Sequence, residues 1–309
     1  MRNFINISDI SKADLRKIID KAKSRKEKRF NLNKNAIDSD TPLNGKILIM
    51  LFEKLSTRTR ISFDLAVRQL GGKSLILNPD EIHYGRGNEN LHDTAKILSQ
   101  YADIVMLRTY SHQNLLDFSK NLKVPIINGL TDLSHPCQIM SDIMTFEELK
   151  GSIKNKKISW LGDGNNVLYS LIEAAVQFDF QLSIACPKGC EPNKKILYWA
   201  KKNKGNIYLT KKPEEASDSA DCIMTDKWIS MNDKINKNKK KKILKPYQVN
   251  KKIMKLANKD AIFMHCLPAN RGEEVTNEVM DGKQSAVWLE ALNRIHAQKS
   301  IIEWCLEKK

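Results

Sequence analysis

Hydrophobic and polar positions follow one another in a pattern that predicts strands, each followed by a helix. The clearest example begins at residues 47–52, where the run ILIMLF has no polar alternation, as in a parallel strand that is covered on both faces. Apolar residues then recur at near-helical spacing from Ile61 to Leu70. Gly71 and the glycine after it can end that helix. The pattern predicts strand, loop and helix between residues 47 and 72.

The same pattern recurs through both halves of the chain. Residues 8–29 predict an amphipathic helix capped by Ser8. Further helices are expected at residues 91–101, 139–149, 167–178 and 289–306. Further strands are expected within residues 74–78, 102–108, 124–130, 158–166, 182–186, 206–210, 221–226 and 261–268.

This alternation predicts an α/β fold made of two doubly wound parallel-sheet domains. A chain of 309 residues is long enough for two cores. The polar stretch around residues 151–157 marks the boundary. We place the first domain at 1–147 and the second at 148–291, and expect the C-terminal helix, 292–309, to pack back on the first.

The loop between the strand at 47–52 and its helix has the chemistry of an anion site. Residues Ser56 to Arg60 fall where the first turn of a helix has backbone N–H groups without partners and a positive dipole. Hydroxyl groups add donors, and the planar fork of Arg58 can bind two phosphate oxygens. The glycines and the Gly-Lys pair of a Walker A loop are absent. The alternative interpretation is an ordinary capped helix with solvated arginines.

Other polar residues lie at strand ends in the same half. Arg108 ends one predicted strand, and the loop with His135 to Gln138 follows another. Ligands in open α/β sheets bind beyond the carboxyl ends of the strands, where these residues are expected to meet Ser56 to Arg60. Taken singly, Arg108 could form a surface ion pair and His135 could be a capping or core histidine.

The second half repeats the strand, glycine turn and helix of a nucleotide-binding unit at residues 158–178. The turn Gly162 to Gly164 lacks the third glycine of the dinucleotide fingerprint, and Asp163 would repel a pyrophosphate. Asp226 and the stretch His265 to Pro268 lie at later strand ends. A buried His-Cys pair alone is more often structural than catalytic.

Composition limits the class of protein. Hydrophobic residues make up 41% and charged residues 28%, as in soluble globular proteins. The apolar runs are too short to span a bilayer, and the first residues lack the features of a signal or transit peptide. Six cysteines without paired zinc-site spacing predict reduced thiols, and hence a cytoplasmic protein. These cysteines are at positions 137, 186, 190, 222, 266 and 305.

The formal net charge of +16 raises the alternative of a nucleic-acid-binding protein. The distribution of charge disfavours it, because lysine is spread through the chain. The one dense run, Lys237 to Lys245, has no interleaved aromatic residues for base stacking. We expect this run to be a solvated loop.

Four motifs occur in order at predicted strand ends, and together they resemble the ornithine carbamoyltransferases of the aspartate/ornithine carbamoyltransferase superfamily. The first two, which carbamoyltransferases share generally, are Ser56-Thr57-Arg58-Thr59 and His135-Pro136-Cys137-Gln138. The other two resemble the ornithine branch: Asp226 with Ser230-Met231, and His265-Cys266-Leu267-Pro268. The resemblance covers nearly the whole chain.

The resemblance implies transfer of a carbamoyl group from carbamoyl phosphate to the side-chain amine of L-ornithine, with no metal or organic cofactor. It also implies an active site in the cleft between the two domains. It implies that carbamoyl phosphate contacts Ser56, Thr57, Arg58, Thr59, His83, Arg108, His135, Pro136, Cys137, Gln138, Cys266, Leu267 and Arg294. Ornithine would contact Asn166, Asp226, Ser230 and Met231. The implied catalytic residues are Arg108, His135, Cys266 and Asp226.

The resemblance also implies a cytoplasmic homotrimer that serves arginine biosynthesis, with a site shared across the subunit interface through the loop at residues 80–90. His83 stands where that family often has glutamine, and Leu292 stands where an acid is common. A carbamoyltransferase for putrescine or acetylornithine is the alternative enzyme. Neither a nucleic acid nor a membrane is expected as a partner.

Overall fold

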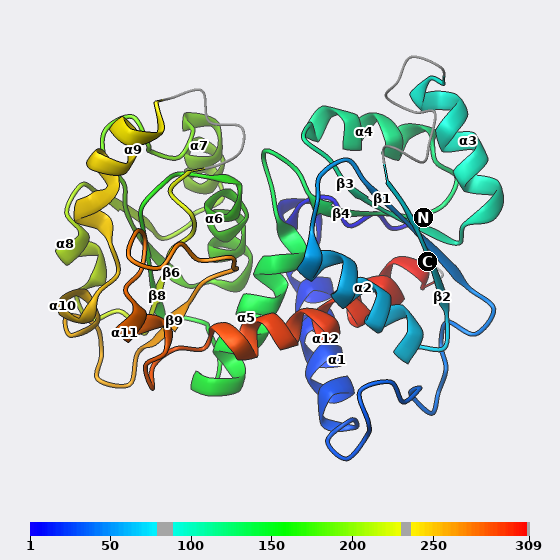
Figure 1. The fold of residues 1–309 in the computed structure, drawn as a ribbon, viewed down its shortest axis with the longest axis horizontal. Helices are drawn as coiled ribbons and strands as arrows, with labels where there is room; N and C mark the ends of the chain where they lie inside the picture. The colour runs from blue at the N-terminus through cyan, green and yellow to red at the C-terminus, as the bar shows by residue number, and fades with distance from the viewer. Residues whose placement is uncertain (79–88, 230–235, 308–309) are drawn as a thin grey trace. The chain divides into compact units, whose positions relative to one another are not determined.

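The computed structural model describes residues 1–78, 89–229 and 236–307, and within them the chain forms two compact units (Figure 1). The first unit contains residues 1–144 and the chain from residue 292 onward, and the second contains residues 145–291. The sequence prediction divided the chain between 147 and 148 and between 291 and 292. Each unit is an α/β fold with an all-parallel sheet, as predicted.

The first sheet has the strand order β2-β1-β3-β4. Its strands are β1 (Ile47–Phe52), β2 (Lys73–Leu77), β3 (Ile104–Arg108) and β4 (Ile126–Leu130). β1 is central and buried from Leu48 onward, which explains why its sequence is apolar on both faces. In this order the chain changes direction between β1 and β3, so the residues after these two strands face a natural binding crevice of the sheet.

Helices cover both faces of this sheet. They are α1 (Lys12–Glu27), α2 (Thr57–Gln69), α3 (Leu91–Tyr101) and α4 (His112–Asn121). Apolar residues of α3 and α4 pack with Ile49 and Val105 in one core cluster, and α2 lies on the opposite side of the sheet (Figure 1). The predicted helix start at Ser8 is wrong. Residues Ile7–Asp9 form a short 3-10 helix, and Ser11 caps α1 by accepting the Asp14 N–H at 3.1 Å.

The C-terminal helix α12 (Val287–Leu306) is tied to α1 by buried charges. The Arg25 guanidinium binds both Glu303 and Asp38, and Lys299 reaches Asp38 Oδ2 at 2.9 Å. These side chains are at most 8% exposed. Removing one partner from such a network leaves a buried charge uncompensated, at a cost of about 3–5 kcal/mol. The network therefore holds the end of the chain on the first unit.

The second sheet has the order β7-β6-β5-β8-β9, so its chain reversal lies between β5 and β8. Its strands are β5 (Lys157–Leu161), β6 (Gln181–Ala185), β7 (Ile207–Thr210), β8 (Cys222–Met224) and β9 (Ile262–Met264). In Figure 1, α6 lies on one side of it and α8 and α10 on the other. The remaining helices are α5 (Pro136–Lys150), α6 (Asn166–Phe178), α7 (Lys194–Lys202), α8 (Pro213–Ser217), α9 (Lys237–Leu244), η3 (Lys245–Tyr247), α10 (Lys251–Met254) and α11 (Asn277–Met280).

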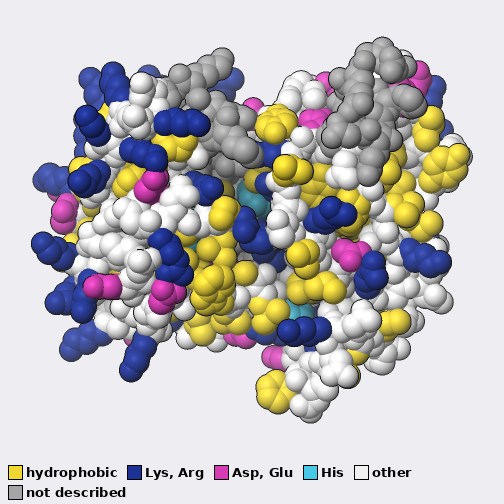
Figure 2. All heavy atoms as spheres, viewed as in Figure 1, with side chains coloured by type: hydrophobic (Ala, Val, Ile, Leu, Met, Phe, Trp, Pro, Cys, Tyr) yellow, Lys and Arg dark blue, Asp and Glu magenta, His cyan; other side chains and the backbone are white. Residues whose placement is uncertain are grey.

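The lysine-rich run is not the solvated loop that its composition predicted. It forms α9, which Asn236 caps by accepting the N–H groups of the second and third helical residues. Lys240 in this helix is only 3% exposed and binds Asp163. The prediction was wrong because a run of lysines does not show which of them meets a carboxylate from elsewhere in the chain. Most other lysines and arginines of the second unit are exposed, and many of them are visible on the face shown in Figure 2.

Within the described residues, none of the helices combines the length and the apolar character that a membrane span requires.

Candidate active site

The start of α2 is the candidate anion site. Ser56 has an extended backbone and caps the helix by accepting the Thr59 N–H at 3.2 Å. α2 begins at the next residue, so the N–H groups of its first turn point away from the helix with the positive end of the dipole. Arg58 lies in this turn and is partly buried, whereas Arg60 is exposed. The turn therefore offers an anion several donors at once.

Two further arginines converge on the same turn. Arg108 at the end of β3 donates from Nη1 to Thr59 Oγ1 at 3.3 Å. Arg294 of α12 donates from Nη2 to the same oxygen at 2.9 Å and from Nη1 to the Gln138 side-chain carbonyl. Thr59 and Arg294 are 235 positions apart in the sequence. The fold thus brings guanidinium groups from two distant elements to one hydroxyl group of the turn.

His135 experiences the field of this cluster. The imidazole is 5% exposed. Burial holds its pKa well below the usual range, and the positive charges of Arg294, Arg108, Arg58 and Lys54 lower this pKa further. His135 is therefore neutral at pH 7, and one of its ring nitrogens carries a proton that can be donated. The same field favours a bound anion.

The residues after His135 have different surroundings. Burial raises the pKa of the Cys137 thiol to about 12, and its Sγ donates to the Asn128 carbonyl at 3.3 Å. Cys137 is therefore an unreactive thiol. Gln138 donates from Nε2 to Asp142 Oδ1 at 2.8 Å, which turns its amide oxygen toward Arg294. Pro136 begins α5, where a missing N–H costs nothing.

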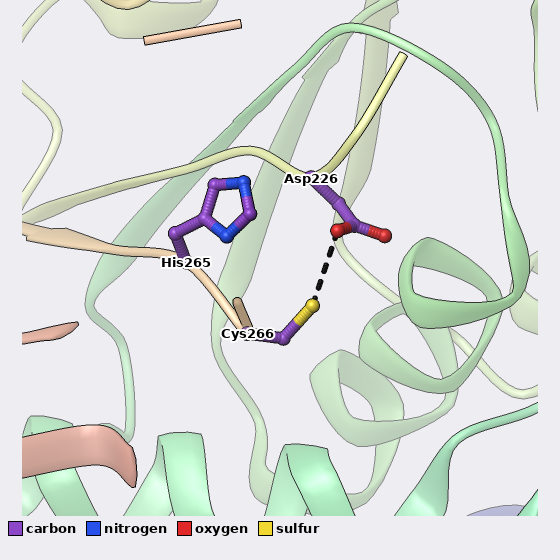
Figure 3. Close-up of side chains that lie close together, drawn as sticks. All are labelled: Asp226, His265 and Cys266. Carbon is purple, nitrogen blue, oxygen red and sulfur yellow. Dashed lines mark hydrogen bonds between the residues drawn. The ribbon is translucent and has the colours of Figure 1, made fainter. Parts of the chain in front are cut away.

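The second cluster lies where the second sheet changes direction. Asn165 follows β5, Asp226 follows β8, and Cys266 follows β9. The Asn165 amide donates from Nδ2 to Asp226 Oδ2 at 2.7 Å, and the Cys266 thiol donates to Asp226 Oδ1 at 3.1 Å. Figure 3 shows the thiol and the carboxylate facing each other. Both carboxylate oxygens thus have protein donors while lone pairs remain for a cationic ligand.

His265 supports the backbone of this cluster. Its ring atom Nδ1 accepts the Leu267 N–H at 2.9 Å, and its backbone N–H donates to Glu290 Oε2 at 2.9 Å. Leu267 has a φ of 58°, a left-handed conformation that is unusual for a non-glycine residue. The hydrogen bond to His265 holds it there. The Leu267 N–H is therefore already used, and the carbonyl groups of this turn are acceptors that a substrate could contact.

Asp226, His265 and Cys266 each offer a metal-ligating atom, and these atoms lie within 4.8 Å of one another. In this arrangement the thiol already donates to the carboxylate, and His265 Nδ1 already accepts a backbone N–H. The ring's other nitrogen lies 3.4 Å from Glu274 Oε1. A cation could bind the three atoms only after these contacts had changed.

The structure adds residues that the sequence analysis did not single out. Asn165 both binds Asp226 and caps α6, since its Oδ1 accepts the Val167 and Leu168 N–H groups at 3.0 and 3.1 Å. The sequence did not single out Asn165, because either of the two neighbouring asparagines, Asn165 and Asn166, could have capped the predicted helix. Lys54 and Asp142 were also missed. Predicted site residues His83, Ser230 and Met231 lie outside the described residues.

Two family descriptions match the chain. Residues 2–148 match the aspartate/ornithine carbamoyltransferase, carbamoyl-P binding domain, and residues 154–305 match the aspartate/ornithine carbamoyltransferase, Asp/Orn binding domain. The chain therefore belongs to the aspartate/ornithine carbamoyltransferase family. The first of these descriptions covers the anion site, and the second covers Asn165 and Asp226.

Within this family the chain is similar over its whole length to proteins named ornithine carbamoyltransferase. It is 51% identical to the one from Mesorhizobium japonicum over 306 residues, which are 99% of each chain. It is 42% identical to the solved structure from Pyrococcus furiosus, with a TM-score of 0.91 and coverage of 97% and 96%. A solved N-acetyl-L-ornithine transcarbamylase is 26% identical, with a TM-score of 0.85 and coverage of 98% and 99%.

Proposed function

We propose that this protein is an ornithine carbamoyltransferase, which transfers the carbamoyl group of carbamoyl phosphate to the side-chain amine of L-ornithine and releases L-citrulline and phosphate. The observation that carries the proposal is identity of about half the residues, over the whole length, with a relative of that name. The two side-chain clusters fit the two substrates. One is cationic and suits carbamoyl phosphate, and the other presents a carboxylate to an amino acid.

The phosphate group occupies the start of α2. Ser56, Thr57 and the backbone N–H groups donate to it, and Arg58 binds its oxygens through the guanidinium fork. Arg294 contributes a second guanidinium from α12. As the bond between the carbamoyl carbon and the phosphate oxygen breaks, negative charge grows on the phosphate, and these fixed donors stabilise it.

The carbamoyl oxygen is bound by Arg108 and His135. Attack on the carbonyl carbon places negative charge on this oxygen, which a guanidinium and a neutral imidazole N–H stabilise by hydrogen bonds. The carbonyl groups of Cys266 and Leu267 are acceptors and suit the carbamoyl NH₂ group. The Leu267 N–H donates to His265, so this group is not assigned to the carbamoyl oxygen.

The amino-acid head of ornithine is bound by Asp226, with Asn166, Ser230 and Met231. Its α-ammonium group needs an acceptor, and the Asp226 carboxylate supplies one. The side-chain amine has an ordinary pKa of about 10.4 and must lose a proton before or during attack. The Asp226 carboxylate can accept this proton, and the Cys266 thiol, which donates to Asp226, lies beside it. With Asp226 at the head, Cys266 is left near the reacting end.

The acceptor is the point at which alternative enzymes differ. Putrescine lacks the α-carboxylate of ornithine, and acetylornithine lacks the α-ammonium charge, so each would leave a polar group of the site unpaired. A nucleic-acid-binding protein is disfavoured, since only the net charge favours it. An assay for citrulline from ornithine and carbamoyl phosphate tests the proposed reaction directly, and absence of citrulline would refute it.

Asp226 tests the acceptor assignment. We expect Asp226→Asn to lower kcat/KM for ornithine by about a hundredfold or more, because the ammonium loses its charged partner. Carbamoyl phosphate affinity should change little. Initial rates with ornithine, putrescine and acetylornithine at saturating carbamoyl phosphate measure this. If putrescine or acetylornithine matched ornithine in the wild type, the substrate assignment would be wrong.

We also propose that the enzyme is a cytoplasmic homotrimer in arginine biosynthesis. All six cysteines are free thiols, which supports a reducing compartment. Formation of citrulline supports a place before arginine synthesis. Growth of a citrulline-requiring bacterial strain without citrulline, when it expresses this chain, would test that direction. In solution, light scattering should give three times the chain mass of 35.4 kDa.

A further inference from the structure

One lysine of the dense run at residues 237–245 is buried, whereas most of its neighbours are exposed. Lys240 is 3% exposed and its Nζ lies 2.8 Å from Asp163 Oδ2, a residue 77 positions earlier in the sequence. Lys239 before it and Lys242 after it are exposed on the same helix. Moving an ammonium group out of water costs several kcal/mol unless a partner compensates it. A run that served only for solubility would leave all of its lysines in water.

Asp163 belongs to the turn that leads into the second side-chain cluster. Its backbone carbonyl accepts the Trp160 indole N–H and the Asn165 N–H, each at 3.1 Å. Gly164 packs so closely against the backbone at 190–192 that a Cβ would lie 2.6 Å from the nearest atom. The turn therefore has little freedom to move without moving Asn165. The Asn165 amide in turn holds Asp226.

α9 is joined to a second segment that supports the same cluster. Lys241 binds Glu273, and the next residue, Glu274, lies beside the buried His265. His265 supports the turn that carries Cys266. Lys240 and Lys241 thus connect α9 to two segments: the turn with Asp163, which precedes Asn165, and the segment with Glu273 and Glu274, which lies beside His265. Of the two ion pairs, the one with Asp163 is the more buried.

We propose that Lys240 is a positioning residue for ornithine: by compensating the buried Asp163 carboxylate, it holds the turn that places Asn165 and therefore orients Asp226. This inference rests on the proposed function. It predicts that loss of the Lys240 charge weakens recognition of ornithine, through a carboxylate left uncompensated beneath the site. It also predicts that carbamoyl phosphate binding is little changed, because residues of the first unit bind the phosphate group and the carbamoyl oxygen.

The test compares full-length Lys240→Met with Lys239→Met and Lys242→Met, which remove the same charge from exposed positions of α9. We expect Lys240→Met to raise KM for ornithine about tenfold or more and the two controls to change it less than about twofold. Calorimetric titration with carbamoyl phosphate should give a Kd within about twofold of the wild type. Equal KM values for Lys240→Met and the controls would overturn the proposal.

A second pair of variants separates positioning from loss of folding. In Lys240→Met/Asp163→Asn no buried charge is left uncompensated, so KM for ornithine should recover by about threefold or more relative to Lys240→Met alone. Lys240→Arg retains the charge and should recover it in part. A double variant no better than Lys240→Met, or parallel loss of carbamoyl phosphate affinity, would contradict the inference.

Assays of the wild-type protein distinguish failure of the proposed function from failure of the role proposed for Lys240. A wild type that forms no citrulline would refute the proposed function and this inference with it. An active wild type with a normal Lys240→Met variant would refute the inference alone.

Discussion

Two arginines of α2 have different surroundings, although they lie in the same helical turn. Arg58 is partly buried and close enough to His135 to lower its pKa, whereas Arg60 is exposed. Proximity to the other cations has a cost that a bound anion would offset. Arg58 is therefore expected to contribute to binding rather than to stability.

Arg58→Ala should weaken carbamoyl phosphate binding by about a hundredfold, since a charge-assisted double contact is lost. Arg60→Ala, the matched control, should bind within about twofold of the wild type. Calorimetric titration of both purified variants measures this. Similar affinities for the two variants would remove Arg58 from the site.

Burial of His296 makes the free energy of unfolding depend on pH. Burial lowers its pKa from an ordinary 6.5 to about 3, and three cations act in the same direction while one carboxylate opposes them; these are Lys299, Lys26, Arg29 and Asp38. Between pH 6.5 and 3 the unfolded chain binds a proton at this position that the folded chain does not. Stability therefore falls as the pH falls through this window.

We expect the free energy of unfolding to drop between pH 6.5 and 4.5, with roughly 2 kcal/mol of the decrease due to His296. His296→Gln should remove this share of the decrease. His92→Gln, at an exposed histidine, should leave it unchanged. Urea unfolding at several pH values gives both slopes. If the two variants lost the same stability on acidification, His296 would not be the group responsible.

At the scale of elements, the residue that caps α6, Asn165, makes two kinds of contact. The Asn165 side-chain oxygen caps the helix while its NH₂ group binds Asp226. An aspartate at this position would still cap, because its oxygens also accept backbone N–H groups. It would, however, place a second carboxylate against Asp226. Capping and substrate recognition can therefore be separated at one position.

Asn165→Asp should keep the wild-type Tm within about 3 °C, while KM for ornithine rises about tenfold or more. Asn165→Ala should lose both functions, with a loss of about 1 kcal/mol of stability. Thermal unfolding and steady-state kinetics of the two variants provide the comparison. A normal ornithine KM in Asn165→Asp would show that contact with Asp226 is unimportant.

At the scale of the whole molecule, the proposed trimer predicts that inactive chains can complement each other. If His83 serves a neighbouring site, mixing refolded His83→Ala and Arg58→Ala chains should generate some sites with both residues intact. The specific activity of the mixture should exceed that of either variant alone. Activity no greater than the average of the two would argue against a shared site.

The sequence by itself determined the elements and the positions of most chemical groups. The apolar run of β1, the periodicity of α3 and the polar strand ends were visible because secondary structure follows local patterns, with a period of two or 3.6 residues. Three local errors are instructive. The start of α1 was misplaced from Ser11 to Ser8, α9 was taken for a loop, and Asn165 was passed over for its neighbour.

Only the tertiary structure decided which of these groups meet. Arg294 donates a hydrogen bond to Thr59, which lies 235 positions earlier in the sequence, and Lys240 donates one to Asp163, which lies 77 positions earlier. No local pattern distinguishes Lys240 from Lys239, because both are helical lysines. Burial beside a carboxylate makes the difference, and burial depends on the packing of α9 against a distant turn. The sequence therefore determined what chemistry was available, and the fold decided where it was assembled, since contacts between distant segments depend on packing rather than on periodicity.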